Sequence, residues 1–169
     1  MEFYELIRKR YSVRAYQSTP IEEETLQRVL EAAVLAPTAA NRQSFQIIVV
    51  KTIGKEEQLK AVYPNPWFAQ APLVVCACGL PQQNWVRRDG KNYVDVDVAI
   101  MMDHLILAAA NEGLGTCWIG AFDPNPLRKL LDLPLDVEPI VLTPLGYPAD
   151  QPNSKRRKPV SELVRYERW

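Results

Sequence analysis

The sequence lacks an excess of charge of either sign. Its 169 residues include 20 Lys and Arg and 20 Asp and Glu, so the formal net charge at pH 7 is zero. General binders of nucleic acid or of anionic membranes carry a positive excess, and we therefore expect neither partner. The length suits one domain covering residues 1–169, and a hydrophobic fraction of 47% excludes a disordered chain.

Histidine is nearly missing as well. The one histidine, His104, falls inside a predicted helix, where we favour a core or interface position over the role of a base. A hydrolase with a histidine-dependent triad is therefore not expected. No group of His, Cys and acidic residues has the spacing of a metal site, so no metal is expected. The glycines at 113 and 115 follow a helix and lack the third glycine of a dinucleotide fingerprint.

Cysteine is scarce, and its number is odd. With three cysteines and no signal peptide, we expect a reduced protein of the cytoplasm. Cys76 and Cys78 would share one face of a strand. We favour buried thiols at these positions over a redox pair.

The sequence contains no long uninterrupted apolar run. A membrane-spanning helix needs about 20 apolar residues, but Asp95, Asp97, Asp103 and His104 interrupt the most apolar stretch, residues 94–111. We therefore expect no membrane span. The remaining positions are apolar nearly all round, which predicts a helix buried in the core or in a subunit interface.

Hydrophobic patterns divide the chain into strands and helices. The predicted strands cover residues 45–51, 72–79, 116–122 and 138–148. The predicted helices cover residues 3–9, 20–36, 54–63, 94–111 and 125–133. Because strands and helices interleave, the pattern favours a layered α/β arrangement. The tail, residues 150–169, is polar and basic with one small apolar patch, and we expect it to fray or to lie on a partner subunit.

Two groups of basic residues lie near the two ends of the chain, within residues 8–14 and 155–158. Arginine side chains combined with hydroxyl donors are suited to binding a phosphate monoester. Arg10, Ser12 and Arg14 alternate, so in an extended segment all three point the same way. Two solvated basic segments without a ligand are the alternative interpretation of the charges alone.

Four short motifs follow one another along nearly the whole chain. Residues 10–16 read R-Y-S-V-R-A-Y, residues 36–43 read A-P-T-A-A-N-R-Q, residues 113–120 read G-L-G-T-C-W-I-G, and residues 157–159 read R-K-P. Each motif is weak alone. Together they resemble the nitroreductase family of FMN-dependent NAD(P)H oxidoreductases, and the chain is similar to its compact members.

The resemblance implies a fold different from the one that the periodicity favours. It implies an α+β fold with a central mixed, mostly antiparallel sheet flanked by helices. Members of the family are intertwined homodimers, in which the long helix packs across the interface and the C-terminal tail reaches over the partner. Two FMN molecules would lie at the interface, one in each site.

The resemblance also implies roles for particular residues. Arg10 and Arg157 would hold the FMN phosphate, with Lys155 close by. Ser12 would bond the phosphate or the ribityl chain. Arg14 would face flavin N1 and the C2 carbonyl, where reduction places negative charge.

The remaining expected cofactor residues belong to the same motifs. The residues of the second motif, contributed by the other subunit, would pack against the flavin ring. Backbone N–H groups of the third motif would point to flavin O4 and N5. These residues are Tyr11 in the first motif, Pro37, Thr38, Ala39 and Asn41 in the second, and Gly120 and Ala121 in the third.

The activity that the resemblance implies is a ping-pong reaction. NAD(P)H would pass hydride to flavin N5, and a small-molecule acceptor, nitroaromatic or quinone, would then be reduced at the same ring. The cofactor carries this chemistry, so no side chain is assigned as catalytic. Asn65, Trp67 and Phe68 are candidates for the walls of the acceptor pocket. Core packing is an equally open alternative for Trp67 and Phe68.

Two other functions stay open at this point. One is an FMN-binding protein that stores or senses the flavin without useful turnover. The other is a specialised dehydrogenase or flavin-modifying enzyme of the same family. The sequence does not decide between NADH and NADPH as the hydride donor.

Overall fold

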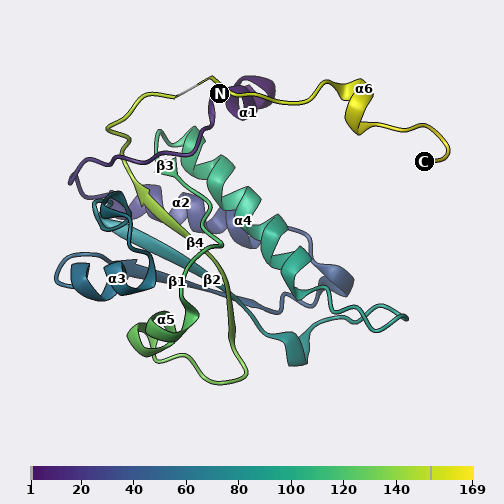
Figure 1. Ribbon diagram of the computed structural model, residues 1–169, viewed down its shortest axis with the longest axis horizontal. Coiled ribbons are helices and arrows are strands. Elements are labelled where there is room, and N and C mark those ends of the chain that lie inside the picture. The colour runs from purple at the N-terminus through teal and green to yellow at the C-terminus, as the bar shows by residue number, and fades with distance from the viewer. Residues whose placement is uncertain (1, 153) are drawn as a thin grey trace.

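The computed structural model describes residues 2–152 and 154–169, and it shows one sheet with helices on both faces (Figure 1). The strands are β1 (Phe45–Lys51), β2 (Leu73–Gly79), β3 (Gly115–Thr116) and β4 (Glu138–Gly146), in the order β1-β2-β4-β3. The helices are α1 (Phe3–Lys9), α2 (Glu23–Val34), α3 (Glu56–Val62), α4 (Val94–Asn111), α5 (Pro124–Leu131) and α6 (Val160–Leu163). Short 3-10 turns cover Ala39–Asn41, Pro66–Ala69 and Pro81–Gln83.

All pairs of named strands in the sheet run antiparallel. A parallel bridge between Ser12 and Thr116 gives the sheet its mixed character. The layered α/β prediction is therefore wrong, and the α+β fold is confirmed. The physical reason lies in the connection between β1 and β2. Lys51 at the end of β1 pairs with Leu73 at the start of β2, and the Thr52 N–H donates to the Pro72 carbonyl (3.2 Å), so the chain re-enters the sheet at the end where it left it.

The central strand β2 is buried along its whole length and faces two separate cores. Its side chains at 73, 75 and 77 join the core beneath α2 and α4, and those at 74, 76 and 78 join the core beneath α3 and α5. Cys76 and Cys78 lie on the same face with their Sγ atoms 3.5 Å apart. Both are fully buried free thiols, which confirms that part of the prediction.

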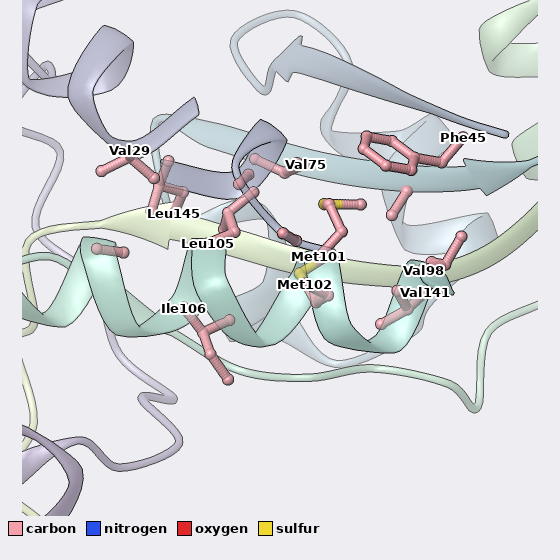
Figure 2. Packing of buried hydrophobic residues seen from close by; sticks show 14 of the residues in the cluster. Val29, Phe45, Val75, Val98, Met101, Met102, Leu105, Ile106, Val141 and Leu145 are labelled. Atoms are coloured by element: carbon pink, nitrogen blue, oxygen red, sulfur yellow. The ribbon is translucent and has the colours of Figure 1, made fainter. Parts of the chain in front are cut away.

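Helix α4 has the bounds that the sequence predicts, and it fills the first core. Figure 2 shows Met101 and Leu105 turned toward Val75 and Leu145 of the sheet, whereas Ile106 points to the other side of the helix. The outer side of α4 is only half-buried although it is apolar, with residues such as Ile100 and Leu107. Within the described residues, no helix combines the length and the apolar composition needed to cross a membrane.

Most predicted elements are shorter in the structure, and two of them differ most. Helix α2 begins at Glu23 rather than at residue 20, and no side chain caps it. The preceding residues stay extended, and Ile21 packs against the core. Of the strand predicted over 116–122, β3 keeps only the start. The Cys117 N–H donates to the side chain of Thr143 in β4 (3.0 Å) instead of to a backbone carbonyl, and pairing resumes only as an isolated bridge between Ile119 and Leu142.

The C-terminal tail extends away from the body of the molecule (Figure 1). Its apolar side chains are exposed, as Val160 at 70% and Leu163 at 65% show. The body of the same chain therefore does not cover the small apolar patch of the tail.

Candidate functional site

The two basic segments from opposite ends of the chain meet in one cavity of about 260 Å³. Residues 10–12 and 14 form one wall, and residues 150–151 and 154–157 form the other. The cavity brings together the side chains for which the sequence predicts phosphate binding: Arg10, Ser12, Arg14, Lys155 and Arg157. Tyr11 lines the same cavity.

The first wall is an extended segment held against β3. The Val13 N–H donates to the Thr116 carbonyl (2.9 Å), and the Tyr16 hydroxyl donates to the Val13 carbonyl (2.9 Å). Val13 is only 1% exposed, whereas Arg14 beside it is exposed. The alternation that the sequence predicts is therefore present, with the apolar residue turned inward and the two neighbouring polar residues turned to the cavity.

An acidic residue that no motif marks connects the two walls. Asp150 accepts hydrogen bonds from the Arg14 backbone N–H (2.7 Å) and from the Tyr11 hydroxyl (3.0 Å). Burial, together with the hydrogen bond to Asp150, raises the pKa of Tyr11 to about 12, so the hydroxyl remains a donor at neutral pH. The sequence offers no signal for this role, because Asp150 is one of several polar residues in an irregular segment.

The cations of the cavity repel one another. Desolvation, followed by repulsion from Arg10 and Arg157, lowers the pKa of Lys155. Its ammonium donates to the backbone carbonyl oxygens of Ile7 (3.4 Å) and Arg8. An anion bound among these side chains would relieve the repulsion, which is the electrostatic situation of a phosphate site.

Cys117 lies behind this wall and is not a reactive group. Burial raises the pKa of its thiol, although Arg14 and Ser12 oppose that shift. The side chain is 5% exposed, and we assign it to packing beneath the cationic cavity.

The second motif forms a strained loop at a different place. Ala40, Asn41 and Gln43 have φ values of 51°, 52° and 51°, a region that residues with a Cβ seldom adopt. Two of the hydrogen bonds that hold the loop use a side-chain acceptor. The Gln43 N–H donates to Thr38 Oγ1 (3.0 Å), and the Ala39 N–H donates to Asp97 Oδ1 (2.9 Å).

Asp97 reaches this loop from inside the protein. It lies in the first turns of α4 and is 2% exposed. Its second oxygen, Oδ2, is buried and has no hydrogen-bond partner among the described residues. The sequence places Asp97 on the apolar helix but gives no signal that it anchors the loop.

The cationic cavity and the strained loop lie at opposite ends of α4. Arg10 and Val13 line a hollow with Ala110 near the C-terminal end of the helix, whereas Ala39 is bonded to Asp97 near its N-terminal end. A rise of about 1.5 Å per residue separates Asp97 from Ala110 by about 20 Å. One flat ligand cannot contact both regions within a single chain.

The third motif ends beside a second cavity, of about 490 Å³, that Gly120 lines together with Asp95 and Arg128. A Cβ added at Gly120 would meet no atom within 4 Å. The backbone N–H groups of Gly120 and Ala121 have no acceptor among the described residues. They are free to bind acceptor atoms of a ligand.

The three candidates for an acceptor pocket have different surroundings. Phe68 is fully buried, with its ring 5.4 Å from that of Tyr63, so we place it in the core and not in a pocket wall. Trp67 is half-buried and packs beside the wall formed by residues 10–16. Asn65 is exposed and lines a separate cavity of about 350 Å³.

Comparison with known proteins gives consistent matches. The model of the nitroreductase family matches residues 7–64 and 53–147. The structure of a nitroreductase family protein from Clostridium difficile 630 is 38% identical, with a TM-score of 0.92 and 100% of both chains covered. A nitroreductase family protein from Clostridium novyi NT is 32% identical, with a TM-score of 0.82, over 89% of this chain and 87% of that one. The FMN reductase (NAD(P)H) of Bacillus subtilis strain 168 is 30% identical over 165 residues, which are 88% of this chain and 66% of the relative.

Proposed function

The chain belongs to the nitroreductase family, and from this premise we propose that it is an NAD(P)H-dependent flavin oxidoreductase that binds FMN. The cationic cavity supports the proposal most directly, because Arg10, Lys155 and Arg157 gather there from distant parts of the chain. Their charges and donors fit a terminal phosphate, and Ser12 adds a hydroxyl.

When bound, FMN supplies reversible two-electron chemistry at its ring. Arg14 is held by the bond between its backbone N–H and Asp150, which fixes the segment that carries its guanidinium. A fixed cation at the edge of the ring would stabilise the negative charge that reduction places there. The free N–H groups of Gly120 and Ala121 would orient the opposite edge.

We propose a homodimer because one chain does not assemble the whole site. The strained loop that the family motif assigns to the ring, with Pro37, Thr38, Ala39 and Asn41, lies about 20 Å along α4 from the cationic cavity. A second copy would bring its own loop to the first copy's cavity. The apolar outer side of α4 and the exposed tail give such a copy surfaces to cover.

For the reaction we propose ping-pong turnover, with a nitroaromatic or quinone as the electron acceptor and Asn65 and Trp67 near its path. The open space at Gly120 would let a flat acceptor approach the ring.

A cytoplasmic location stays a prediction. The alternative is a protein that stores or senses FMN without turnover, and it would use the same cavity.

The test is the visible absorption spectrum of the purified protein, recorded before and after anaerobic addition of NADH and then of NADPH. We expect flavin bands that one nucleotide bleaches, with slower bleaching in Arg14→Ala and partial recovery in Arg14→Lys. Flavin bands that neither nucleotide bleaches would favour storage or sensing. A colourless protein that takes up no added FMN would contradict the proposal.

A further inference from the structure

A basic hairpin, residues 84–93, has no role in the site described above. It protrudes from the body beyond the N-terminal end of α4 (Figure 1). We infer that this hairpin binds the phosphate groups of the NAD(P)H dinucleotide through Arg88 and Lys91. The inference rests on the proposed function and names the part of the protein that recognises the hydride donor.

The hairpin is an ordered unit. Val86 and Asn92 form an antiparallel bridge, and the N–H of Arg87 donates to the carbonyl of Lys91 (2.9 Å). The rings of Trp85 and Tyr93 pack edge to face with centroids 5.0 Å apart. The backbone that carries its cations is therefore ordered before a ligand arrives, which lowers the entropic cost of binding.

The charges of the hairpin are unbalanced at its tip. Asp89 is already bonded to Arg87, with an Nη2 to Oδ2 distance of 2.6 Å, and Arg87 also donates to the Tyr93 hydroxyl. Arg88 has no hydrogen bond or ion pair in the described part of the chain, and it is exposed. The Lys91 backbone N–H donates to Asp89 (3.3 Å), and its ammonium makes no hydrogen bond in the described residues but faces the Tyr93 ring at 6.0 Å from the centroid. Two cations thus remain available in a protein of zero net charge.

The base of the hairpin adjoins two parts of the proposed sites: the strained loop, which this chain would give to the partner's site, and the Gly120 cavity of its own site. The Leu80 N–H donates to the Ser44 carbonyl (3.0 Å) at the end of the strained loop, and the Asn92 side chain donates to the Pro81 carbonyl (2.9 Å). Asp95, just beyond the hairpin, lines the cavity that contains Gly120. A dinucleotide with its nicotinamide at the ring would extend its phosphates toward this hairpin.

The test compares hydride donors with and without phosphate groups. Anaerobic bleaching is followed against the concentration of NADPH, of NADH and of 1-benzyl-1,4-dihydronicotinamide, which carries no phosphate. In Arg88→Gln and Lys91→Gln we expect the Kd for dinucleotides to rise roughly tenfold, as for the loss of one charge-assisted contact. The benzyl donor should react as with the parent protein. An effect on NADPH alone would assign the contact to the 2′-phosphate, and an effect on both dinucleotides would assign it to the pyrophosphate.

Direct binding and a matched variant complete the test. Calorimetric titration with ADP-ribose should show the same loss without any turnover where the contact is to the pyrophosphate, and titration with 2′-phospho-ADP-ribose should show it where only NADPH is affected. Lys129→Gln on α5 removes another exposed charge and should change neither the Kd for the dinucleotides nor the Kd for ADP-ribose. Unchanged dinucleotide and ADP-ribose binding in both hairpin variants would overturn the inference, as would equal weakening of the benzyl donor. If no donor bleaches the parent protein but ADP-ribose binding still needs Arg88 and Lys91, the proposed function fails and the hairpin site stands.

Discussion

Two aspartates determine how single residues are arranged in the site, and each reaches a different part of it. Asp150 joins the two walls of the cationic cavity, and Asp97 holds the strained loop from within the core. The sequence predicts the cations themselves, because arginine and serine alternate in a recognisable motif. It does not predict the aspartates, because a carboxylate that accepts backbone N–H bonds needs no particular neighbours in sequence.

Replacing Asp150 tests whether it positions the phosphate site. In Asp150→Ala, the Arg14 N–H and the Tyr11 hydroxyl lose their acceptor, and we expect FMN affinity to fall about tenfold. Asp150→Asn keeps an acceptor oxygen and should recover part of the affinity. Fluorescence titration with FMN measures both variants. Tighter binding by the alanine variant would show instead that the negative charge mainly repels the phosphate.

Replacing Asp97 tests the loop. Asp97→Ala leaves the Ala39 N–H without its acceptor, so the strained conformation of residues 40–43 loses its hydrogen bond to α4. We expect a loss of about 1–3 kcal/mol in the free energy of unfolding, measured by urea denaturation. FMN affinity should fall as well, and Asp97→Asn should restore part of it. Normal FMN binding in the alanine variant would show that the loop takes no part in the FMN site.

At the scale of elements, the sequence predicts which segments are buried better than it predicts how the strands pair. The sequence predicts β1, β2 and α4 because their apolar positions are continuous. It overestimates the length of β3, because the side chain of Thr143 in β4 accepts the Cys117 N–H and interrupts the backbone pairing. It also gives no strand direction, since the short helix α3, rather than any side chain, returns the chain to the same end of the sheet.

Contact between β3 and the phosphate-binding wall depends on a glycine. A Cβ at Gly115 would lie 2.6 Å from Val13 Cγ2 and 2.9 Å from Val13 Cβ. We expect Gly115→Ala to cost about 1–3 kcal/mol of stability and to weaken FMN binding by displacing the wall. Thermal unfolding without FMN measures the first effect. Gly120→Ala, with open space around it, is the control and should unfold at the temperature of the parent protein.

At the scale of the whole molecule, the chain leaves apolar surface uncovered. The tail carries exposed residues such as Leu163, and the outer side of α4 is apolar. Composition and periodicity predict that these segments need a neighbour but do not say which one. The family resemblance suggests a second copy, and the separation of the cavity from the loop gives an independent physical reason for it.

The separation of the two regions along α4 has a consequence for dimers that contain two different variants. When each site takes its cavity from one chain and its loop from the other, defects in the two regions complement each other. A heterodimer of Asp150→Ala with Asp97→Ala has one site with both defects and one site with none. Equal mixing of the two weakened proteins through unfolding and refolding should therefore restore about a quarter of the sites to parental affinity. A mixture of two variants of the same region should restore no site to parental affinity.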